Sequence, residues 1–542
     1  MVVRLRFFML VIILLGITSM LSFIWPIMLW ALVAIIPFLL VGLYDALQSK
    51  LNILRNYPVW GHFRYLLLSI RPHIQQYFIQ SDQNGRPFNK EMRDLVYSRA
   101  QGTEDNVPFG TQLDVNTPGH TWINHSLTPV KPCLVGTRVK VGGPQCTQPY
   151  SASRFNISAM SFGALSAEAI RALNRGAKLA ECAHDTGEGG LSRHHLSEGG
   201  DIIWEIGSGY FGCRTPDGHF NPEMFAEKAQ HPNVKMVELK LSQGAKPGHG
   251  AILPGEKVSA EIAEARNVPI GQDCLSPALH STFSTPLEMM RFISTMRDLS
   301  GGKPAGFKLC IGIRSEFMAI CKAMLETGIY PDFITIDGAE GGTGAAPVEF
   351  SDYVGTPIDE ALIFVHNCLV GTNLREHIRL IASGKIISGF DILTKIALGA
   401  DMCNSARGMM FALGCVQSRR CHTNTCPTGV ATQDPGRRYA LDVDTKSQYV
   451  ANYHAHTVQS FLHVLGAAGL QRPEELHPSH IHRRINERHV LTYAEIYHYM
   501  APNQLLDGTA PKEYLRDWEL ANANTFNVSF GETHRAKSQD AA

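Results

Sequence analysis

Charge is missing from one long stretch near the start of the chain. No Asp, Glu, Lys or Arg occurs between Phe7 and Tyr44. This run is too long for one membrane-spanning helix of about 20 residues and suits two. Pro26 lies near its middle and indicates a turn, so we expect helices near residues 5–22 and 27–47.

Basic residues stand at both outer ends of this apolar run. Arg4 and Arg6 precede it, Lys50 and Arg55 follow it, and the turn carries no charge. Because basic residues favour the cytoplasmic side, the pattern predicts a hairpin in the inner (plasma) membrane with the remaining chain in the cytoplasm. A cleaved signal peptide, or a hairpin that enters only one leaflet, would show a similar run.

Other features are missing as well. Lys and Arg together number 49, as do Asp and Glu, so the basic excess typical of nucleic-acid binders is absent. The sequence contains no internal repeat of 20 to 50 residues, the period that is typical of solenoid proteins. Residues 207–212 read GSGYFG, but the turn residues and proline that follow do not form the helix that a dinucleotide-binding fingerprint requires.

Short β-rich runs alternate with helical patterns between residues 151 and 470, which predicts a parallel sheet covered by helices. A span of this length fits an α/β fold of the (β/α)8 TIM-barrel type. We expect four parts: a transmembrane hairpin (1–48), a mixed region packing on the barrel (49–150), the barrel (151–470) and a C-terminal extension (471–542). The strand candidates are RFNIS (154–158), DIIWEI (201–206), KMVELKL (235–241), AGFKLCI (305–311), DFITID (332–337), GKIISG (384–389) and DMCNSA (401–406).

Polar and glycine residues follow several of these candidate strands. Lys240, Lys308 and Asp337 lie at or near the ends of three of them, and Gly389 and Arg407 follow the last two. In TIM barrels the C-terminal strand ends carry the chemistry, and phosphate often binds after strands seven and eight. Glycines there are also ordinary turn residues, so each one alone has a structural explanation.

Three cysteines lie close together in GCVQSRRCHTNTCPTGVATQ (414–433), with the spacing C-x5-C-x4-C. They are Cys415, Cys421 and Cys426. Three thiolates match the number of ligands that a three-iron cluster needs, since cysteine is the usual iron–sulfur ligand. Zinc would need a fourth ligand, which His422 could provide, and a disulfide would leave one thiol over.

Five stretches together resemble the FMN-binding central domain of glutamate synthase. They occur in the family's order over about 300 residues, and the third and fifth are long and specific. In chain order they are ISAMSFGALS (157–166), DTGEGG (185–190), LKLSQGAKPGHGAILPGEKV (239–258), EGGTGAAP (340–347) and GCVQSRRCHTNTCPTGVATQDP (414–435).

The resemblance implies an FMN barrel, a 3Fe–4S cluster bound by the three cysteines, and a 2-oxo acid substrate. It implies catalytic roles for Glu188 and Lys246, with Glu188 relaying protons. The substrate-binding residues it implies are Lys240, Gln243, Lys246 and Arg266, because a dicarboxylate needs cations at both ends. The cofactor-binding residues it implies are Ser158, Met160, Ser161, Lys308, Gly341, Gly342, Thr343, Gly389, Asp391, Ser405 and Arg407. Arg266 could also be an exposed helix residue, and Glu188 a loop or capping residue.

The chain also departs from the family pattern. The family's glutaminase domain begins with a cysteine nucleophile, whereas residue 2 here is Val and an apolar run follows. We therefore expect ammonia from solution or from a separate glutaminase, and electrons from a ferredoxin-like donor or a separate reductase. Where the family commonly reads SGHDGGTGASP, this chain reads IDGAEGGTGAAP at residues 336–347.

The expected activity is reductive amination of 2-oxoglutarate, or a similar 2-oxo acid, to glutamate. Two alternatives remain open on the sequence. One is a membrane-tethered FMN-dependent dehydrogenase of amino acids or N-methylamino acids. The other is a redox sensor or membrane scaffold without catalytic activity.

Overall fold

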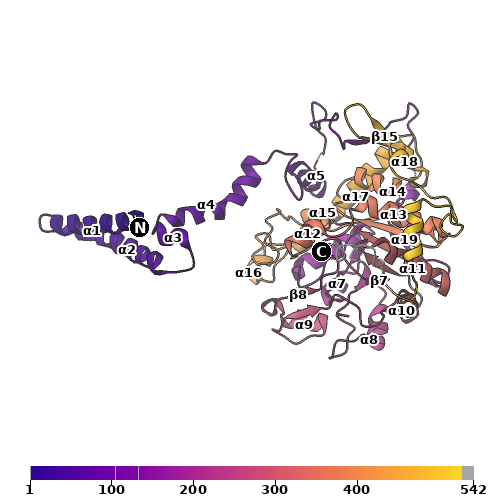
Figure 1. Cartoon of the computed structure of the whole chain (residues 1–542), viewed down its shortest axis with the longest axis horizontal. Helices are drawn as coiled ribbons and strands as arrows, with labels where there is room; N and C mark the ends of the chain where they lie inside the picture. The colour runs from indigo at the N-terminus through magenta and orange to yellow at the C-terminus, as the bar shows by residue number, and fades with distance from the viewer. Residues whose placement is uncertain (1, 104, 132–133, 528–542) are drawn as a thin grey trace, which may run out of the picture. The chain divides into compact units, whose positions relative to one another are not determined.

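A computed structural model describes residues 2–103, 105–131 and 134–527 of the chain (Figure 1). The chain forms two compact units that divide between Glu91 and Met92. The four-part division at residues 48, 150 and 470 stays a prediction.

The N-terminal unit contains the two expected apolar helices. α1 spans Val2–Ser22, and after a turn a 3-10 segment (Pro26–Ala31) leads into α2 (Leu32–Leu47). By length and composition, Leu5–Ser22 and Pro26–Leu47 could each cross a membrane, with mean hydropathies of 2.2 and 2.5. Signal sequences and buried core helices share these properties. The hairpin is followed by α3 (Asn52–Asn56), α4 (Gly61–Ile74) and a π-helical turn (Gln75–Ile79).

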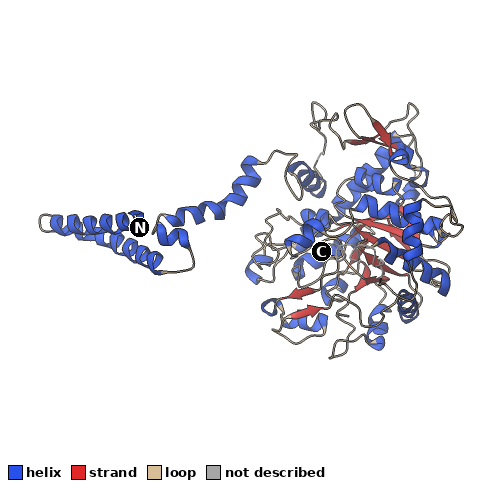
Figure 2. Ribbon diagram, in the orientation of Figure 1, coloured by secondary structure: helices blue, strands red, loops and turns tan. Residues whose placement is uncertain are grey.

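The second unit is built around a closed barrel of eight parallel strands, so the predicted TIM-barrel fold is confirmed (Figure 2). Each strand pairs with its neighbours in parallel register, and the last strand closes onto the first through Ser405 and Ile157. The strands in order are β4 (Phe155–Ile157), β5 (Ala183–Asp185), β6 (Asp201–Ile206), β7 (Val234–Lys240), β10 (Ala305–Leu309), β11 (Phe333–Asp337), β12 (Arg379–Ser383) and β13 (Met402–Ser405).

Helices surround the barrel and follow its strands in turn (Figure 2). The long α17 packs against α6 and α14 and covers the side where the barrel closes. The helices after the strands are α6 (Ala167–Leu179), α7 (Arg193–Leu196), α8 (Pro222–Ala229), α9 (Ala260–Arg266), α10 (Pro286–Leu299), α11 (Arg314–Thr327), α12 (Val348–Tyr353), α13 (Ile358–Gly371), α14 (Gly389–Ala397), α15 (Arg407–Ala412), α16 (Pro435–Arg438) and α17 (Val443–Ala467).

One predicted strand is wrong. GKIISG (384–389) is not a strand; the seventh strand is the preceding segment, Arg379–Ser383. Lys385 has φ of 50°, which interrupts an extended conformation. Ser388 then caps α14, its Oγ accepting from the Asp391 backbone N–H. The sequence also offered no candidate for β5, because two of its three residues, His184 and Asp185, are polar.

An apolar plug fills the N-terminal end of the barrel. The hairpin of β2 (Arg138–Val141) and β3 (Tyr150–Ser153) packs against inward-facing residues of the barrel strands. Strand residues alternate between the two faces, so the residues two positions further along also face inward. The plug therefore sets the floor above which the polar residues of the barrel lie. Its members are Val139, Val141, Tyr150, Ala152, Ala183, Ile203, Met236, Phe333, Ile381 and Met402.

The segments before and after the barrel pair with each other. β1 (Thr121–Ile123) runs antiparallel to β14 (Ile481–Arg484), which pairs with β15 (Val490–Thr492). Other elements are α5 (Lys90–Gln101), which begins just before the boundary, the hairpin of β8 (Ala251–Leu253) and β9 (Cys274–Ser276), α18 (Tyr493–Ile496) and α19 (Lys512–Leu520).

Candidate functional site

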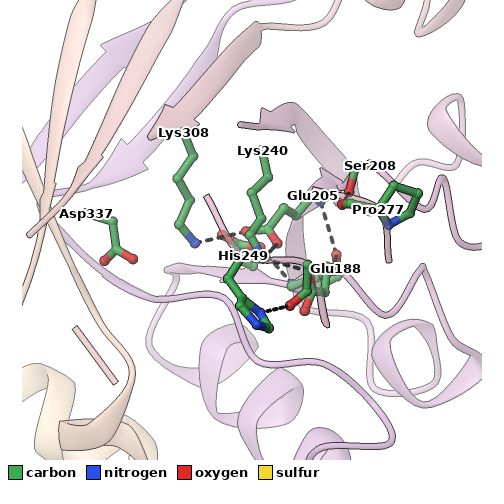
Figure 3. A network of polar contacts seen from close by, with 12 residues as sticks. Glu188, Glu205, Ser208, Lys240, His249, Pro277, Lys308 and Asp337 are labelled. Atoms are coloured by element: carbon green, nitrogen blue, oxygen red, sulfur yellow. Dashed lines mark hydrogen bonds and ion pairs between the residues drawn. The ribbon is translucent and has the colours of Figure 1, made fainter. Parts of the chain in front are cut away.

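Four alternating charges form a row at the C-terminal end of the barrel (Figure 3). Lys308 Nζ on β10 lies 2.9 Å from Glu205 Oε2 on β6. Lys240 Nζ at the end of β7 lies 3.7 Å from Glu205 Oε1 and 2.9 Å from Glu188 Oε2. Side-chain exposure rises from 1% at Glu205 to 9% at Lys240 and 24% at Glu188. The row therefore leads from the barrel interior to its mouth.

The pairing fixes the charges of these groups. Burial alone would lower the pKa of Lys308, but Glu205 and the neighbouring carboxylates raise it well above its usual value. Burial would also lower the pKa of Lys240, but the charges of Glu188 and Glu205 raise it above its usual value. Burial raises the pKa of Glu188, but Lys240 and other cations bring it down to about 2. Glu188 is thus ionised at neutral pH, where it anchors Lys240.

Three buried carboxylates meet directly above the apolar plug. They belong to Asp185, Glu205 and Glu238, each two residues beyond a plug residue of its strand, and their oxygens lie within 4.8 Å of one another. Thr335 Oγ1 donates a hydrogen bond to Glu238. Lys308 supplies a positive charge at this set, so the carboxylates have a counterion without a metal.

Burial and crowding change how these carboxylates titrate. Burial and the charge of Glu205 raise the pKa of Glu238 to about 7, against the opposing effect of Lys308. Burial and the two neighbouring acids raise the pKa of Asp185 well above its usual value. The sequence reading missed this cluster. Its signal was an acid among the apolar residues near the end of each of the strands DIIWEI and KMVELK, Glu205 and Glu238.

Three cations gather around Glu188 at the mouth of the barrel. Lys240 contacts it directly, and Lys246 and Arg266 both act on its pKa through their charges. Burial lowers the pKa of Lys246, and Lys240 lowers it further. Gln243 is half-buried, and its carbonyl accepts from the Lys246 N–H at 3.3 Å.

Arg266 is held at the end of α9. Its guanidinium lies 5.1 Å from the centre of the Phe211 ring, and Nη2 donates to the Phe162 carbonyl at 3.4 Å. Only 5% of the residue is exposed, so it is not the exposed helix residue that the sequence left open.

The loops after β4 and β5 pack tightly against each other. The Met160 N–H donates to the Asp185 carbonyl at 3.2 Å, and Ser158 Oγ lies 3.4 Å from Ser383 Oγ. A Cβ atom on Gly187 would come within 3.0 Å of the Ser161 backbone nitrogen. The three residues predicted from ISAMS therefore lie on one constrained loop at the barrel's C-terminal end.

Arg407, at the start of α15, contacts the loop after β11. Its Nη2 donates to the Glu340 carbonyl at 2.6 Å. A Cβ atom on Gly342 would lie 3.0 Å from the Arg407 side chain, so this neighbour must be small. Burial lowers the pKa of Arg407 to about 10, which leaves it charged at neutral pH. Gly341 and Thr343 are the sequence neighbours of Gly342, on either side of its approach to Arg407.

Asp391, Ser405 and Gly389 have structural contacts of their own. Asp391 Oδ2 accepts from the backbone N–H groups of Ile387 and Ser388, and Ser405 Oγ donates to the Ile386 carbonyl at 2.6 Å. A Cβ atom on Gly389 would come within 2.3 Å of the α17 backbone. These contacts shape the loop after β12.

The three clustered cysteines follow α15 and are free thiols. Burial raises the pKa of Cys415 to about 12, and the charges of Cys421 and Cys426 also act to raise it. Burial also raises the pKa of Cys421. Burial would do the same at Cys426, but hydrogen bonds from the Thr428 side chain and from nearby backbone amides lower its pKa.

The GSGYFG segment (207–212) leads into turns, and the next helix begins only at Pro222. The structure thus agrees with excluding a dinucleotide-binding turn there.

A family model described as "Conserved region in glutamate synthase" matches residues 142–471. The glutamate synthase large subunit-like protein YerD of Bacillus subtilis is 36% identical over 507 residues, covering 86% of this chain and 96% of that protein. The archaeal glutamate synthase (NADPH) of Methanocaldococcus jannaschii is 36% identical over 321 residues, covering 59% of this chain and 60% of that protein.

Among solved structures, a flavocytochrome b2 mutant with pyruvate bound is 12% identical. The match covers 81% of this chain and 91% of that chain, with a TM-score of 0.39. A similarity this low carries no argument about function.

Proposed function

Because the chain belongs to the glutamate synthase family, we propose that it aminates a 2-oxo dicarboxylic acid, such as 2-oxoglutarate, reductively to an amino acid such as glutamate. Ammonia would come from solution or from a separate glutaminase. The electrons would come from a ferredoxin-like protein or a separate reductase.

The observation that carries this proposal is the set of cations around Glu188. Lys240, Lys246 and Arg266 oppose one carboxylate there. Among these four groups two positive charges remain, which matches the two negative charges of a dicarboxylate. Arginine binds a carboxylate bidentately, so Arg266 would fix one end of the substrate and the lysines the other.

Lys246 is the best-suited proton donor of this group. Its pKa is lowered by burial and by Lys240, and acid–base groups work best when their pKa lies close to the working pH. Lys246 would hold a proton at Nζ for the developing amino group. Glu188, with a pKa of about 2, would position Lys240 and orient the substrate by repulsion, with proton relay as a secondary role.

The chain's residues fit FMN in their chemistry. Arg407 is half-buried after the eighth strand, and α14 and α15 begin after the seventh and eighth, where phosphates bind in TIM barrels. Lys308 is a buried cation suited to a reduced, anionic ring. FMN, when bound, supplies two-electron transfer.

Two groups of residues would hold the cofactor. The ring end would be bordered by Ser158, Met160, Ser161, Gly341, Gly342 and Thr343. At the phosphate end, Arg407 would bind the anion, while Gly389, Asp391 and Ser405 would shape the loop rather than contact it, because Asp391 is an anion already occupied by two amides.

The cysteine cluster fits an iron–sulfur centre. The backbone and hydroxyl hydrogen bonds to Cys426 favour its thiolate, and such bonds to sulfur tune these clusters. Cys415, Cys421 and Cys426 would bind a 3Fe–4S cluster, which supplies one-electron transfer when bound. With His422 as a fourth ligand, the same site would bind zinc instead of the cluster.

The apolar hairpin supports a location at the plasma membrane. Two helices long enough to cross would place the barrel in the cytoplasm, following the basic residues at both ends of the hairpin. The same hairpin favours the second candidate function, a membrane-tethered dehydrogenase of amino acids or N-methylamino acids. Its electrons would then pass to an acceptor in the membrane.

The test uses anaerobic, cofactor-loaded full chain in detergent. We expect 2-oxoglutarate with ammonia to reoxidise the reduced flavin and to yield glutamate. Lys246→Met should lower the rate at least tenfold, whereas Lys178→Met, an exposed lysine on α6, should leave it unchanged. No reoxidation above buffer, with FMN and iron present, would reject the proposal. Bleaching of the oxidised flavin by an amino acid would favour the dehydrogenase.

A further inference from the structure

Helix α4 (Gly61–Ile74) carries an exposed apolar face. Five of its large apolar residues recur at intervals of three and four, which places them on one side of the helix, whereas Leu68, 46% exposed, lies outside this face. Their exposed fractions range from 38% to 61%. Within its own unit, the short α3 and the following π-helical turn lie against α4, and His62 at its start contacts Asp45 of α2 (Figure 1). The face consists of Phe63, Leu66, Leu67, Ile70 and Ile74.

Basic and imidazole side chains border this face on both sides. On a helix of 3.6 residues per turn, Arg64 and Arg71 lie along one edge, and His62 and His73 lie along the other. Ser69 points away from the face. Between residues 46 and 81 the chain has no Asp or Glu. The segment is therefore apolar on one side and cationic or neutral elsewhere.

The start of α4 is fixed to the end of the apolar hairpin. Asp45, in the last turn of α2, is buried and accepts from the Val59 N–H at 2.8 Å. His62 Nε2 lies 2.9 Å from the same carboxylate oxygen. Asp45 is the first charged residue after the apolar run, so this contact brings α4 to the level where the apolar hairpin ends.

We propose that α4 lies on an anionic phospholipid surface. The five apolar side chains would enter the boundary between headgroups and acyl chains, and Arg64 and Arg71 would contact lipid phosphates. Trp60, 66% exposed just before the helix, has the amphipathic ring that favours the membrane interface.

A second copy of the chain fits this face less well. Two α4 helices packed in parallel through their apolar faces would place the arginine edge of each helix beside the histidine edge of the other, so that no negative charge faces the arginines. The sequence between residues 46 and 81 has no acid to pair with them. Anionic headgroups supply the missing negative charge. This inference is independent of the proposed catalytic function, since it concerns residues outside the barrel.

The first experiment locates lipid next to α4 in the full chain. A photoreactive amino acid replaces Leu67 on the apolar face, or Ser69 on the opposite side as the matched control. Both proteins are placed in nanodiscs of phosphatidylcholine and phosphatidylglycerol, irradiated and analysed by mass spectrometry. We expect several-fold more lipid adduct at position 67 than at 69. Adducts to a second chain, or equal yields at both positions, would overturn the proposal.

The second experiment tests the charge of the surface. With the probe at position 67, we expect the adduct yield to fall several-fold in pure phosphatidylcholine discs. We expect the same fall in mixed discs when Arg64→Glu and Arg71→Glu are combined. Arg488→Glu, at an exposed position near the C-terminus, is the control and should leave the yield unchanged. A yield that is the same in neutral and anionic discs would overturn an anionic surface.

Discussion

Glu205 and Lys308 form an ion pair of 2.9 Å, although only 1% of the Glu205 side chain and 4% of the Lys308 side chain are exposed. The other oxygen of Glu205 lies 3.7 Å from Lys240. One buried carboxylate therefore joins the lysine proposed for the cofactor to the lysine proposed for the substrate.

Glu205→Gln should destabilise the barrel, because Lys308 and Lys240 would lose a shared counterion. Breaking a buried pair costs about 3–5 kcal/mol. We expect the lower end, since Asp185 and Glu238 also face Lys308. The thermal midpoint of the full chain, compared with the exposed Glu223→Gln on α8, measures this. Equal midpoints would mean that the pair is not formed.

Stability should depend on pH through Glu238. Its folded pKa, about 7, lies above the ordinary value of 4.5, so between these values the folded chain binds more protons than the unfolded one. The contribution is present below about pH 4.5 and is lost as the pH rises through about 7. Glu238→Gln, which resembles the protonated acid, should flatten the decline in thermal midpoint over this range. An unchanged slope would contradict the raised pKa.

Arg266→Lys should weaken substrate binding more than turnover. Lysine keeps the charge but loses the two-point contact with a carboxylate and the planar contact with Phe211. We expect KM for 2-oxoglutarate to rise at least tenfold, with a smaller change in kcat. Arg214→Lys is the matched control, because Arg214 lies 5.5 Å from the same ring. A similar rise in both variants would indicate a role for Arg266 in packing alone.

Cys421→Ser should remove bound iron while leaving FMN in place, because only the cluster depends on this thiol. Iron and flavin content of the purified chain, with the electron paramagnetic resonance signal of the cluster, measure the effect. Cys146→Ser changes a cysteine near the N-terminal end of the barrel, where its Sγ donates to the Gly302 carbonyl, and should keep both cofactors. Zinc in place of iron would show that the site is a metal centre of another kind.

The barrel was predictable because its apolar strands repeat between helices. Six of its eight strands could be located from patterns such as DIIWEI and KMVELK. β5 could not, because His184 and Asp185 make up most of this short strand and give no β-rich run. GKIIS was wrong because Lys385, with a positive φ, interrupts an apparently β-rich run. Local propensity does not record such a backbone turn.

The sequence allowed several residues of the candidate site to be named, but not the contacts between them. Lys240 and Lys308 could be named from the strand ends and the family resemblance. Their common partner, Glu205, could not, because it lies on a strand far from both in sequence and only barrel closure brings the three together. The cluster of Asp185 and Glu238 escaped notice for the same reason.

The pairing of β1 with β14 affects how the chain can be shortened. Thr121, Trp122 and Ile123 face Arg483, His482 and Ile481, so a strand before the barrel is completed by one after it. A fragment cut at residues 151 and 470 would lose both partners together. A fragment cut at only one of these points would retain an unpaired strand edge, which invites aggregation. The segments before and after the barrel thus hold each other in place, and a soluble fragment should keep both β1 and β14.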